Sequence, residues 1–92
     1  MIGSWRHKGL RAFYETGSTK GIDPAHAARL RRILGFLDNA TKPSELGLPG
    51  FKLHPLKGAQ AGRWSVWVSG NWRVTFGFAG SHAADVDLED YH

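Results

Sequence analysis

The sequence contains no cysteine, so no disulfide bond can stabilise the fold of its 92 residues. This absence also fits a reducing compartment, and we expect the protein in the cytoplasm. A long apolar run is missing as well: the stretch 1–5 is too short for a signal peptide or a membrane span and is followed at once by Arg6 and Lys8. We therefore expect no membrane partner. Acidic residues are few, because eight Asp and Glu stand against twelve Lys and Arg, and the formal charge of +4 favours a nucleic acid or an acidic protein as partner.

A chain of this length without covalent cross-links has to fold on its hydrophobic core alone. It can bury roughly two-thirds of the surface that its unfolded form exposes. Four Trp and five Phe supply much of the apolar bulk. The sequence shows no internal repeat and no low-complexity segment, and we predict a single domain over residues 1–92.

The most regular stretch is residues 63–78, RWSVWVSGNWRVTFGF, whose alternation of aromatic and β-branched residues predicts a β-hairpin. A three-residue loop of Ser69, Gly70 and Asn71, with Asn71 in the left-handed conformation, puts the apolar sets of both strands on one face. The predicted core face consists of Trp64, Val66, Val68, Trp72, Val74 and Phe76. The opposite face carries Ser65, Trp67, Arg73 and Thr75. Because this second face places an arginine beside a tryptophan, we expect the functional site there.

Two helices are predicted before the hairpin. Apolar residues at helical spacing and a stop at Gly17 predict the first over residues 8–16. Asp23 as a cap and Pro24 at the first position predict the start of the second. The buried stripe of this second helix is predicted to be Ala27, Leu30, Ile33, Leu34 and Leu37. The basic side chains beside the stripe fit a solvated helix face; they are Arg29, Arg31 and Arg32.

Short strands are predicted at residues 2–5 and 51–56, the second with Pro55 at a strand edge or a strand end. In residues 51–56, one side of the strand carries Lys52, His54 and Leu56. A last strand is predicted to place Ala84, Val86 and Leu88 on the core side. A strand, two helices and then several strands predict an α+β fold, in which a mostly antiparallel sheet carries both N-terminal helices on one face.

Polar residues gather at strand ends and on the non-core face in three segments of the chain. They are His54 with Lys57, Arg73 beside Trp67, and the terminal Asp90, Tyr91 and His92. Each feature alone has an ordinary structural explanation: a satisfied histidine, an arginine stacked on a tryptophan, and a frayed chain end. The chemistry follows only from their combination.

Together these residues provide what metal-independent cleavage of RNA requires. Two groups that titrate near neutrality can take a proton from the ribose 2′-oxygen and give one to the leaving 5′-oxygen. Lys and Arg donors can stabilise the negative charge of the phosphorane between them, and a flat aromatic ring such as Trp67 can hold an unstacked base. A metal site is the alternative, and it would use His54, Asp85, Asp87, Asp90 and His92. No pair of these shows the spacing of a known zinc or two-metal motif, and we expect no metal and no cofactor.

Several blocks of the sequence resemble the HigB toxins of the RelE/ParE superfamily of bacterial toxin–antitoxin systems. They are FKLHPLKG at 51–58, WSV at 64–66, GNWRVTF at 70–76 and VDLEDYH at 86–92, preceded by IGSWRHKGLRAFYETG and PAHAARLRRIL. The resemblance covers nearly the whole chain, with the blocks in the same order. Ala59 and Ala84 depart from it, because an acidic residue and an aromatic residue are common at these positions.

The resemblance implies a ribosome-dependent endoribonuclease that cuts mRNA in the decoding site and stops translation, on a compact microbial-ribonuclease-like RelE fold. It matches His54 to the catalytic histidine, Lys57 and Arg73 to phosphate-contacting cations, and Asp90, Tyr91 and His92 to a functional C-terminal group. It also implies a HigA-like antitoxin whose helix-turn-helix domain binds operator DNA. This chain would then contact operator DNA only indirectly, through the antitoxin.

Two other functions compete with this one. ParE-like members of the superfamily bind DNA gyrase without catalysis, and a small RNA-binding domain would also suit the basic charge and Trp67. The two histidines His54 and His92, together with Lys57 and Arg73, favour the nuclease, because a protein that only binds has no use for an acid–base pair.

Overall fold

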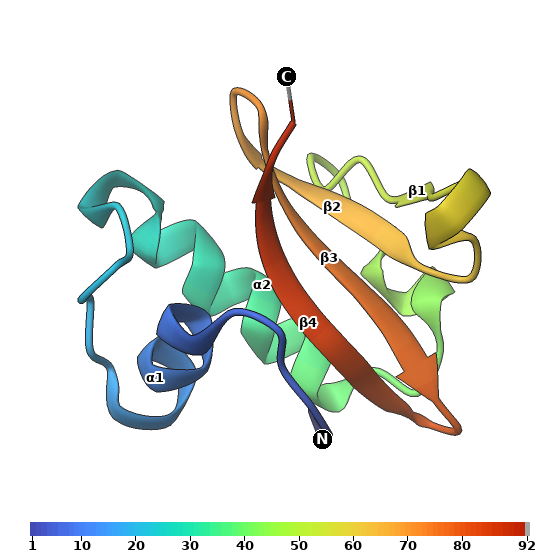
Figure 1. The fold of residues 1–92 in the computed structure, drawn as a ribbon, viewed down its shortest axis with the longest axis horizontal. Helices are drawn as coiled ribbons and strands as arrows, with labels where there is room; N and C mark the ends of the chain where they lie inside the picture. Colours follow the sequence, from blue (N-terminus) through green and yellow to red (C-terminus); the bar gives the residue numbers. More distant parts are fainter. Residues whose placement is uncertain (92) are drawn as a thin grey trace.

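The computed structural model describes residues 1–91 and shows an α+β fold, as predicted (Figure 1). Its two α-helices are α1 (Lys8–Thr16) and α2 (Ala27–Asn39). The strands are β1 (His54–Pro55), β2 (Trp64–Ser69), β3 (Trp72–Ala79) and β4 (His82–Asp90), and they form one antiparallel sheet in the order β1-β2-β3-β4. Within the described residues, no helix is long and apolar enough to cross a membrane.

Both helices have the bounds or the start signals that the sequence predicts. α1 begins after His7, whose Nδ1 accepts a hydrogen bond from Leu10 N (2.9 Å), and it ends at Gly17, which adopts a left-handed φ of 77°. The Asp23 carboxylate accepts a hydrogen bond from Ala25 N (2.9 Å), as a cap does, but the first turn is a 3₁₀ helix (Pro24–His26) that precedes α2.

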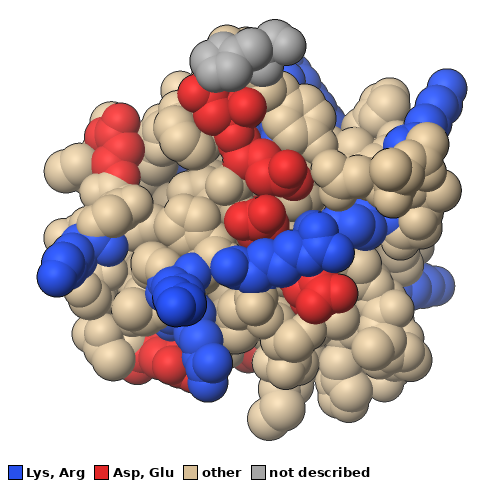
Figure 2. Space-filling view, viewed as in Figure 1, with Lys and Arg blue, Asp and Glu red and all other residues tan. Residues whose placement is uncertain are grey.

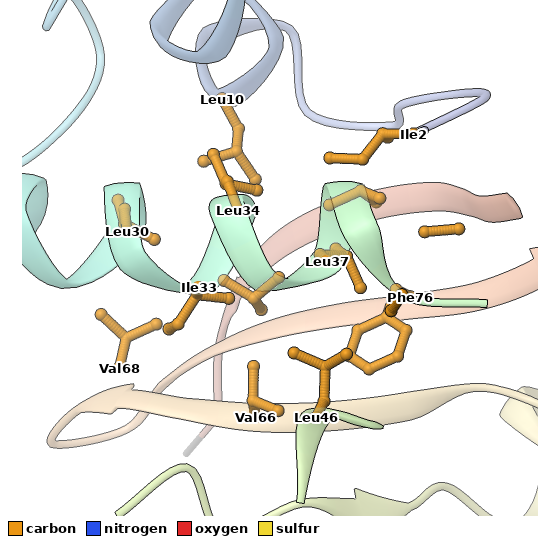
Figure 3. Packing of buried hydrophobic residues seen from close by; sticks show 14 of the residues in the cluster. Ile2, Leu10, Leu30, Ile33, Leu34, Leu37, Leu46, Val66, Val68 and Phe76 are labelled. Carbon is orange, nitrogen blue, oxygen red and sulfur yellow. The ribbon is translucent and has the colours of Figure 1, made fainter. Parts of the chain in front are cut away.

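The core lies between α2 and the sheet, and α1 packs on the far side of α2 (Figure 3). The predicted α2 stripe is confirmed at Leu30, Ile33, Leu34 and Leu37, which are buried, while Ala27 is only partly buried against the core. Figure 3 shows Leu10 of α1 beside Leu34, and Ile33 and Leu37 above the sheet residues Val66 and Phe76. Each fully buried side chain of this kind contributes about 1.5–3 kcal/mol by leaving water. One face of the sheet is therefore buried in the core, and the functional site is expected on the other face.

The predicted hairpin register is confirmed, while its predicted loop is wrong. Trp64 pairs with Phe76 and Val66 with Val74, but Ser69 already pairs with Trp72. The extra residue is accommodated by a bulge at Val68, so both apolar sets stay on the core side. The two-residue turn Gly70–Asn71 takes its positive φ at Gly70 (54°) instead of Asn71, because glycine has no Cβ to clash. Trp64 and Trp72 at the ends of the core face are only half-buried.

A second bulge makes the predicted inward side of β4 wrong at Ala84. Ala83 is fully buried instead, while Val86 remains inward as predicted. The register shifts between Thr75 and Gly77, and Asp85, at φ 51°, is the extra residue. Asp85 N donates to Ser4 Oγ (2.8 Å), so a contact with the N-terminal segment holds the bulge in place.

The other two predicted strands are shorter than expected. Residues 2–5 form only two isolated parallel bridges to β4, Ile2 with Ala83 and Trp5 with Val86. Of residues 51–56, only β1 is a strand, because Lys52 adopts a positive φ of 50° that interrupts the extended backbone. Phe51, just before it, is fully buried, and its carbonyl oxygen accepts a hydrogen bond from Trp67 N (2.7 Å).

Candidate active site

A cleft of about 470 Å³ opens where β1 joins the sheet. Its lining residues are Lys52, His54, Pro55, Leu56, Lys57, Ser65, Arg73 and Tyr91. Four of the predicted site residues, from three separate segments of the chain, thus meet in one place: His54, Lys57, Arg73 and Tyr91. Ser65 and Arg73 come from the hairpin face that the sequence marked for function.

His54 reaches the cleft because β1 pairs with β2. Its partner in register is Ser65, and the Leu56 N–H bonds to the Arg63 carbonyl oxygen (2.8 Å) just beyond the strand. His54 is exposed, as its side of the strand predicted. An exposed imidazole at the mouth of a cleft can exchange protons with a bound substrate.

Arg73 is held by the hairpin turn. Its Nη1 donates to the carbonyl oxygens of Gly70 (3.0 Å) and Trp72 (3.1 Å). The other guanidinium nitrogens make no hydrogen bond with residues 1–91 and can donate to a phosphate in the cleft.

Lys52 lines the cleft as well, although it is not among the predicted site residues. Its Nζ lies 4.5 Å from the centre of the Trp67 ring, over the face of the indole. The strand pattern held a usable signal, because it placed Lys52 on the same side as His54. Among residues 1–91, the cleft lining has three cations, Lys52, Lys57 and Arg73, beside one histidine, and it includes no Asp or Glu.

Trp67 lies beside the cleft and does not line it. The sequence paired its ring with Arg73, which is its neighbour across the hairpin. The cations over the ring are instead Lys52 and Arg29, the latter 5.2 Å from the ring centre. The aromatic side chain inside the cleft is Tyr91.

The C-terminal group is only partly described. Tyr91 N donates to the Asn71 carbonyl oxygen (2.8 Å), which ties the chain end to the hairpin turn. Burial, followed by the Glu89 carboxylate, raises the pKa of the Tyr91 hydroxyl, while Arg63 and Arg73 lower it in part, so the hydroxyl keeps its proton at neutral pH. Asp90 is exposed and pairs with Trp72 at the end of β4. The fourth predicted residue, His92, lies outside the described residues.

A buried chain of polar side chains joins β2, β3 and β4 on the same face of the sheet as the cleft, and the sequence pattern did not predict it. Arg63 is only 9% exposed; its Nη2 donates to Thr75 Oγ1 (3.1 Å) and to the Asp85 carbonyl oxygen (2.9 Å). Thr75 in turn donates to Glu89, the register partner of Arg73. Burial lowers the pKa of Arg63, while the carboxylates of Glu89 and Asp85 oppose this shift.

The charge of the molecule is therefore uneven. Figure 2 shows acidic side chains gathered over β4, the strand that contains Asp85, Asp87, Glu89 and Asp90. The metal alternative would have used several of these. Among residues 1–91, no three His, Cys, Asp or Glu side chains come together in a group that could hold a metal ion.

Comparison with known proteins identifies the family. The family model of the HigB-like toxins, described as the RelE-like toxin of the type II toxin–antitoxin system HigB, matches residues 3–92. The chain is 44% identical over 92 residues to Endoribonuclease HigB from Proteus vulgaris, with 100% of both chains covered.

Two similar solved structures have much lower sequence identity and show the fold alone. One is from a YoeB-YefM complex of Staphylococcus aureus (TM-score 0.66, 12% identity, 100% of this chain and 98% of that chain). The other is a YoeB/ParE toxin from Agrobacterium tumefaciens (TM-score 0.60, 19% identity, 97% and 99%). These likenesses confirm the predicted RelE-type fold. With this fold and a family match from residue 3 to residue 92, the chain belongs to the HigB-like toxins, the RelE-like toxins of type II toxin–antitoxin systems.

Proposed function

We propose that this chain is an endoribonuclease that cuts mRNA on the ribosome and so stops translation, by acid–base chemistry that uses no metal ion. The reaction class is supported by full-length identity of 44% to an endoribonuclease of the same family. The observation that carries the proposal is the cleft, whose lining brings His54 and Tyr91 together with Lys52, Lys57 and Arg73.

The first half of the reaction is the attack of the ribose 2′-oxygen on the adjacent phosphorus. His54 takes the proton from the 2′-hydroxyl as general base, because it is the exposed imidazole of the cleft. Lys57 and Arg73 donate hydrogen bonds to the non-bridging phosphate oxygens, whose negative charge grows as the phosphorane forms. Lys52 adds a third cation at the Trp67 side of the cleft.

The second half is the departure of the 5′-oxygen, which needs a proton. We assign that proton to His92. Its imidazole is the second group of the proposed site of a type that can give up a proton near neutral pH. Tyr91, which keeps its proton, donates a hydrogen bond to the same phosphate.

The ribosome and an antitoxin are the proposed partners. Among the described residues, three cations line the cleft, which is few for holding an RNA strand, so we expect the ribosome to align the mRNA. Positioning of this kind can contribute several powers of ten in rate. Membership of a toxin–antitoxin family supports a HigA-like helix-turn-helix antitoxin, which would connect this chain to operator DNA, and a cytoplasmic setting. The alternatives, gyrase binding and simple RNA binding, do not explain why a histidine and a tyrosine line the same cleft as three cations.

Primer extension on mRNA from a translating lysate tests the proposal. The parent protein should produce new, codon-positioned mRNA ends. His54→Ala and removal of His92 should each abolish them, while His82→Ala should not, because His82 is an exposed β4 histidine outside the cleft. Absence of new ends with the parent, or undiminished ends with His54→Ala, would contradict it.

A further inference from the structure

Gly35 occupies a position where neither the backbone nor the packing calls for glycine. It lies in the interior of α2, where glycine is a poor helix former, and its backbone is ordinary helix. A Cβ built at this position would meet nothing within 4 Å, so no neighbour within the described chain needs the space. The missing side chain leaves a notch on the exposed side of α2.

Two depressions meet at this notch and share Arg31 and Gly35. The first, of about 260 Å³, lies between α1 and α2 and is also lined by Phe13, Tyr14, Gly17 and Leu34. The second, of about 310 Å³, is also lined by Arg32, Phe36 and Asn39. We call the two together the Gly35 groove. Apart from Met1, the exposed large hydrophobic residues among positions 1–91 are Tyr14 (39%) and Phe36 (41%), and both line this groove.

The groove carries two arginines that have no acidic partner. Arg31 lies over the Phe13 ring (5.4 Å), and Arg32 lies over the rings of Phe36 (5.8 Å) and Phe51 (5.4 Å). Neither makes an ion pair or hydrogen bond with residues 1–91, whereas Arg29 on the same helix donates to the backbone oxygens of Trp67 and Gly50.

The acids of the two helices are already engaged. Glu15 pairs with Arg11 (3.2 Å), and Asp38 interacts with the Tyr14 hydroxyl, which raises the pKa of Tyr14 to about 12. The groove is thus apolar at its floor and positive at its rim. Arginine and aromatic side chains in one place are typical of the residues that dominate binding energy at protein interfaces.

We propose that the Gly35 groove binds an acidic, amphipathic segment of the antitoxin, with an apolar side chain in each depression and carboxylates on Arg31 and Arg32. This inference rests on the proposed antitoxin partner. An acidic protein segment fits better than RNA, because only two cations line the groove and its floor is formed by aromatic and aliphatic side chains. The segment would pass over Gly35, where any longer side chain would block it.

Gly35→Gln tests the proposal, because it fills the notch while it improves helix propensity. Its matched control is Ala28→Gln, which stands two turns earlier on α2, is exposed and lines neither depression. Titration calorimetry with the purified cognate antitoxin should show affinity at least about tenfold weaker for Gly35→Gln and unchanged for Ala28→Gln. The melting temperature of free Gly35→Gln should be equal to or above that of the parent.

A double variant, Arg31→Gln with Arg32→Gln, should flatten the decrease of antitoxin affinity with salt. Parent-like affinity of Gly35→Gln overturns the proposal. So does a parent dimer that Gly35→Gln converts to a monomer in sedimentation, which would assign the groove to self-association. If Gly35→Gln instead loses binding to a ribosomal RNA fragment and keeps its antitoxin affinity, the groove is an RNA-binding surface. That result also overturns the proposal.

The mRNA cleavage of each variant is measured in the same preparations, because the groove shares no lining residue with the cleft. Parent-level cleavage by Gly35→Gln together with lost antitoxin affinity supports the groove. A different outcome is also possible, in which Gly35→Gln binds the antitoxin like the parent while the parent cleaves mRNA and His54→Ala does not. That outcome supports the nuclease and overturns only the proposal about the Gly35 groove.

Discussion

At the scale of single residues, side chains of the cleft are held in place by contacts with the backbone and not by packing in the core. Arg73 is the clearest case, because its hydrogen bonds within residues 1–91 go only to the carbonyl oxygens of the turn that carries it. Its side chain adds nothing to the core face. A residue held in this way can be removed at small cost to the fold and at large cost to phosphate binding.

Arg73→Ala should therefore reduce mRNA cleavage on the order of 10²-fold, the usual cost of losing one donor to a developing charge, and abolish growth inhibition. Its far-UV circular dichroism and melting temperature should stay close to those of the parent. If the purified variant unfolds, Arg73 is structural and its position opposite the core set is misassigned.

Lys52 combines a strained backbone with a place in the cleft. A left-handed φ of 50° costs a residue with a side chain roughly 1–2 kcal/mol, and such outliers are a reason to suspect function. In Lys52→Gly the strain is relieved and the interaction with Trp67, about 0.5–1 kcal/mol, is lost, so stability should stay within about 1 kcal/mol of the parent.

Cleavage by Lys52→Gly should nevertheless decrease about tenfold or more, since hydrogen bonds to charged groups contribute roughly 1.5–3 kcal/mol. The matched control is Lys20→Gly, an exposed lysine outside the cleft. Full activity of Lys52→Gly in the lysate assay would remove Lys52 from the site.

At the scale of elements, the polar chain on the open face of the sheet joins β2, β3 and β4. Thr75 is its middle member, because it accepts from Arg63 and donates to Glu89. Thr75→Val keeps the shape of the side chain but removes the hydroxyl, so the buried Arg63 and the partly buried Glu89 each lose one hydrogen bond. We expect a loss of about 1–3 kcal/mol in the free energy of unfolding by urea, against little change for Thr19→Val at an exposed position. An unchanged midpoint would show that water replaces the threonine.

Tyr14 connects α1 to α2 through Asp38, and this contact predicts a pH dependence. The pKa of Tyr14 is raised to about 12 from an ordinary value near 10. The folded state therefore holds this proton more tightly than the unfolded state, and the stability from the contact is complete below pH 10 and lost between about pH 10 and 12. Tyr14→Phe should flatten the decrease of melting temperature over that range. An equally steep decrease in the variant would show that other groups cause it.

The elements also show how far sequence patterns reach. Helical spacing and caps predicted both helices, and strand alternation predicted the hairpin register, because these signals are local. The bulges were not predictable in this way. The bulge at Asp85 depends on a contact with Ser4, which is 81 residues away in the chain. The extended backbone is interrupted at Lys52, next to Phe51, whose side chain is fully buried in the core.

The same division holds for the site. His54, Lys57, Arg73 and Tyr91 were predicted from residue type and family resemblance, and the structure places all four in one cleft. The Arg63–Thr75–Glu89 chain was missed, since it forms only when three strands align. The ordinary explanation of Arg73 as a charge stacked on Trp67 does not hold, because the cations over that ring are Lys52 and Arg29 from other segments.

At the scale of the whole molecule, the sheet separates two surfaces with different chemistry. The cleft lies on the face opposite the hairpin's core set, with His54, Tyr91 and three cations. The Gly35 groove lies on the helices, with exposed aromatic rings and two arginines. Five of the twelve Lys and Arg residues line these two surfaces, whereas acidic side chains gather over β4 (Figure 2).

The central claim is that the ribose 2′-oxygen of the mRNA, and neither a metal-bound water nor a free one, attacks the phosphorus. The chemical ends of mRNA cut in a translating lysate test this most directly. Attack by the 2′-oxygen predicts a 2′,3′-cyclic phosphate on the upstream fragment and a 5′-hydroxyl on the downstream fragment, both absent with His54→Ala. A 3′-hydroxyl upstream with a 5′-phosphate downstream would contradict the account.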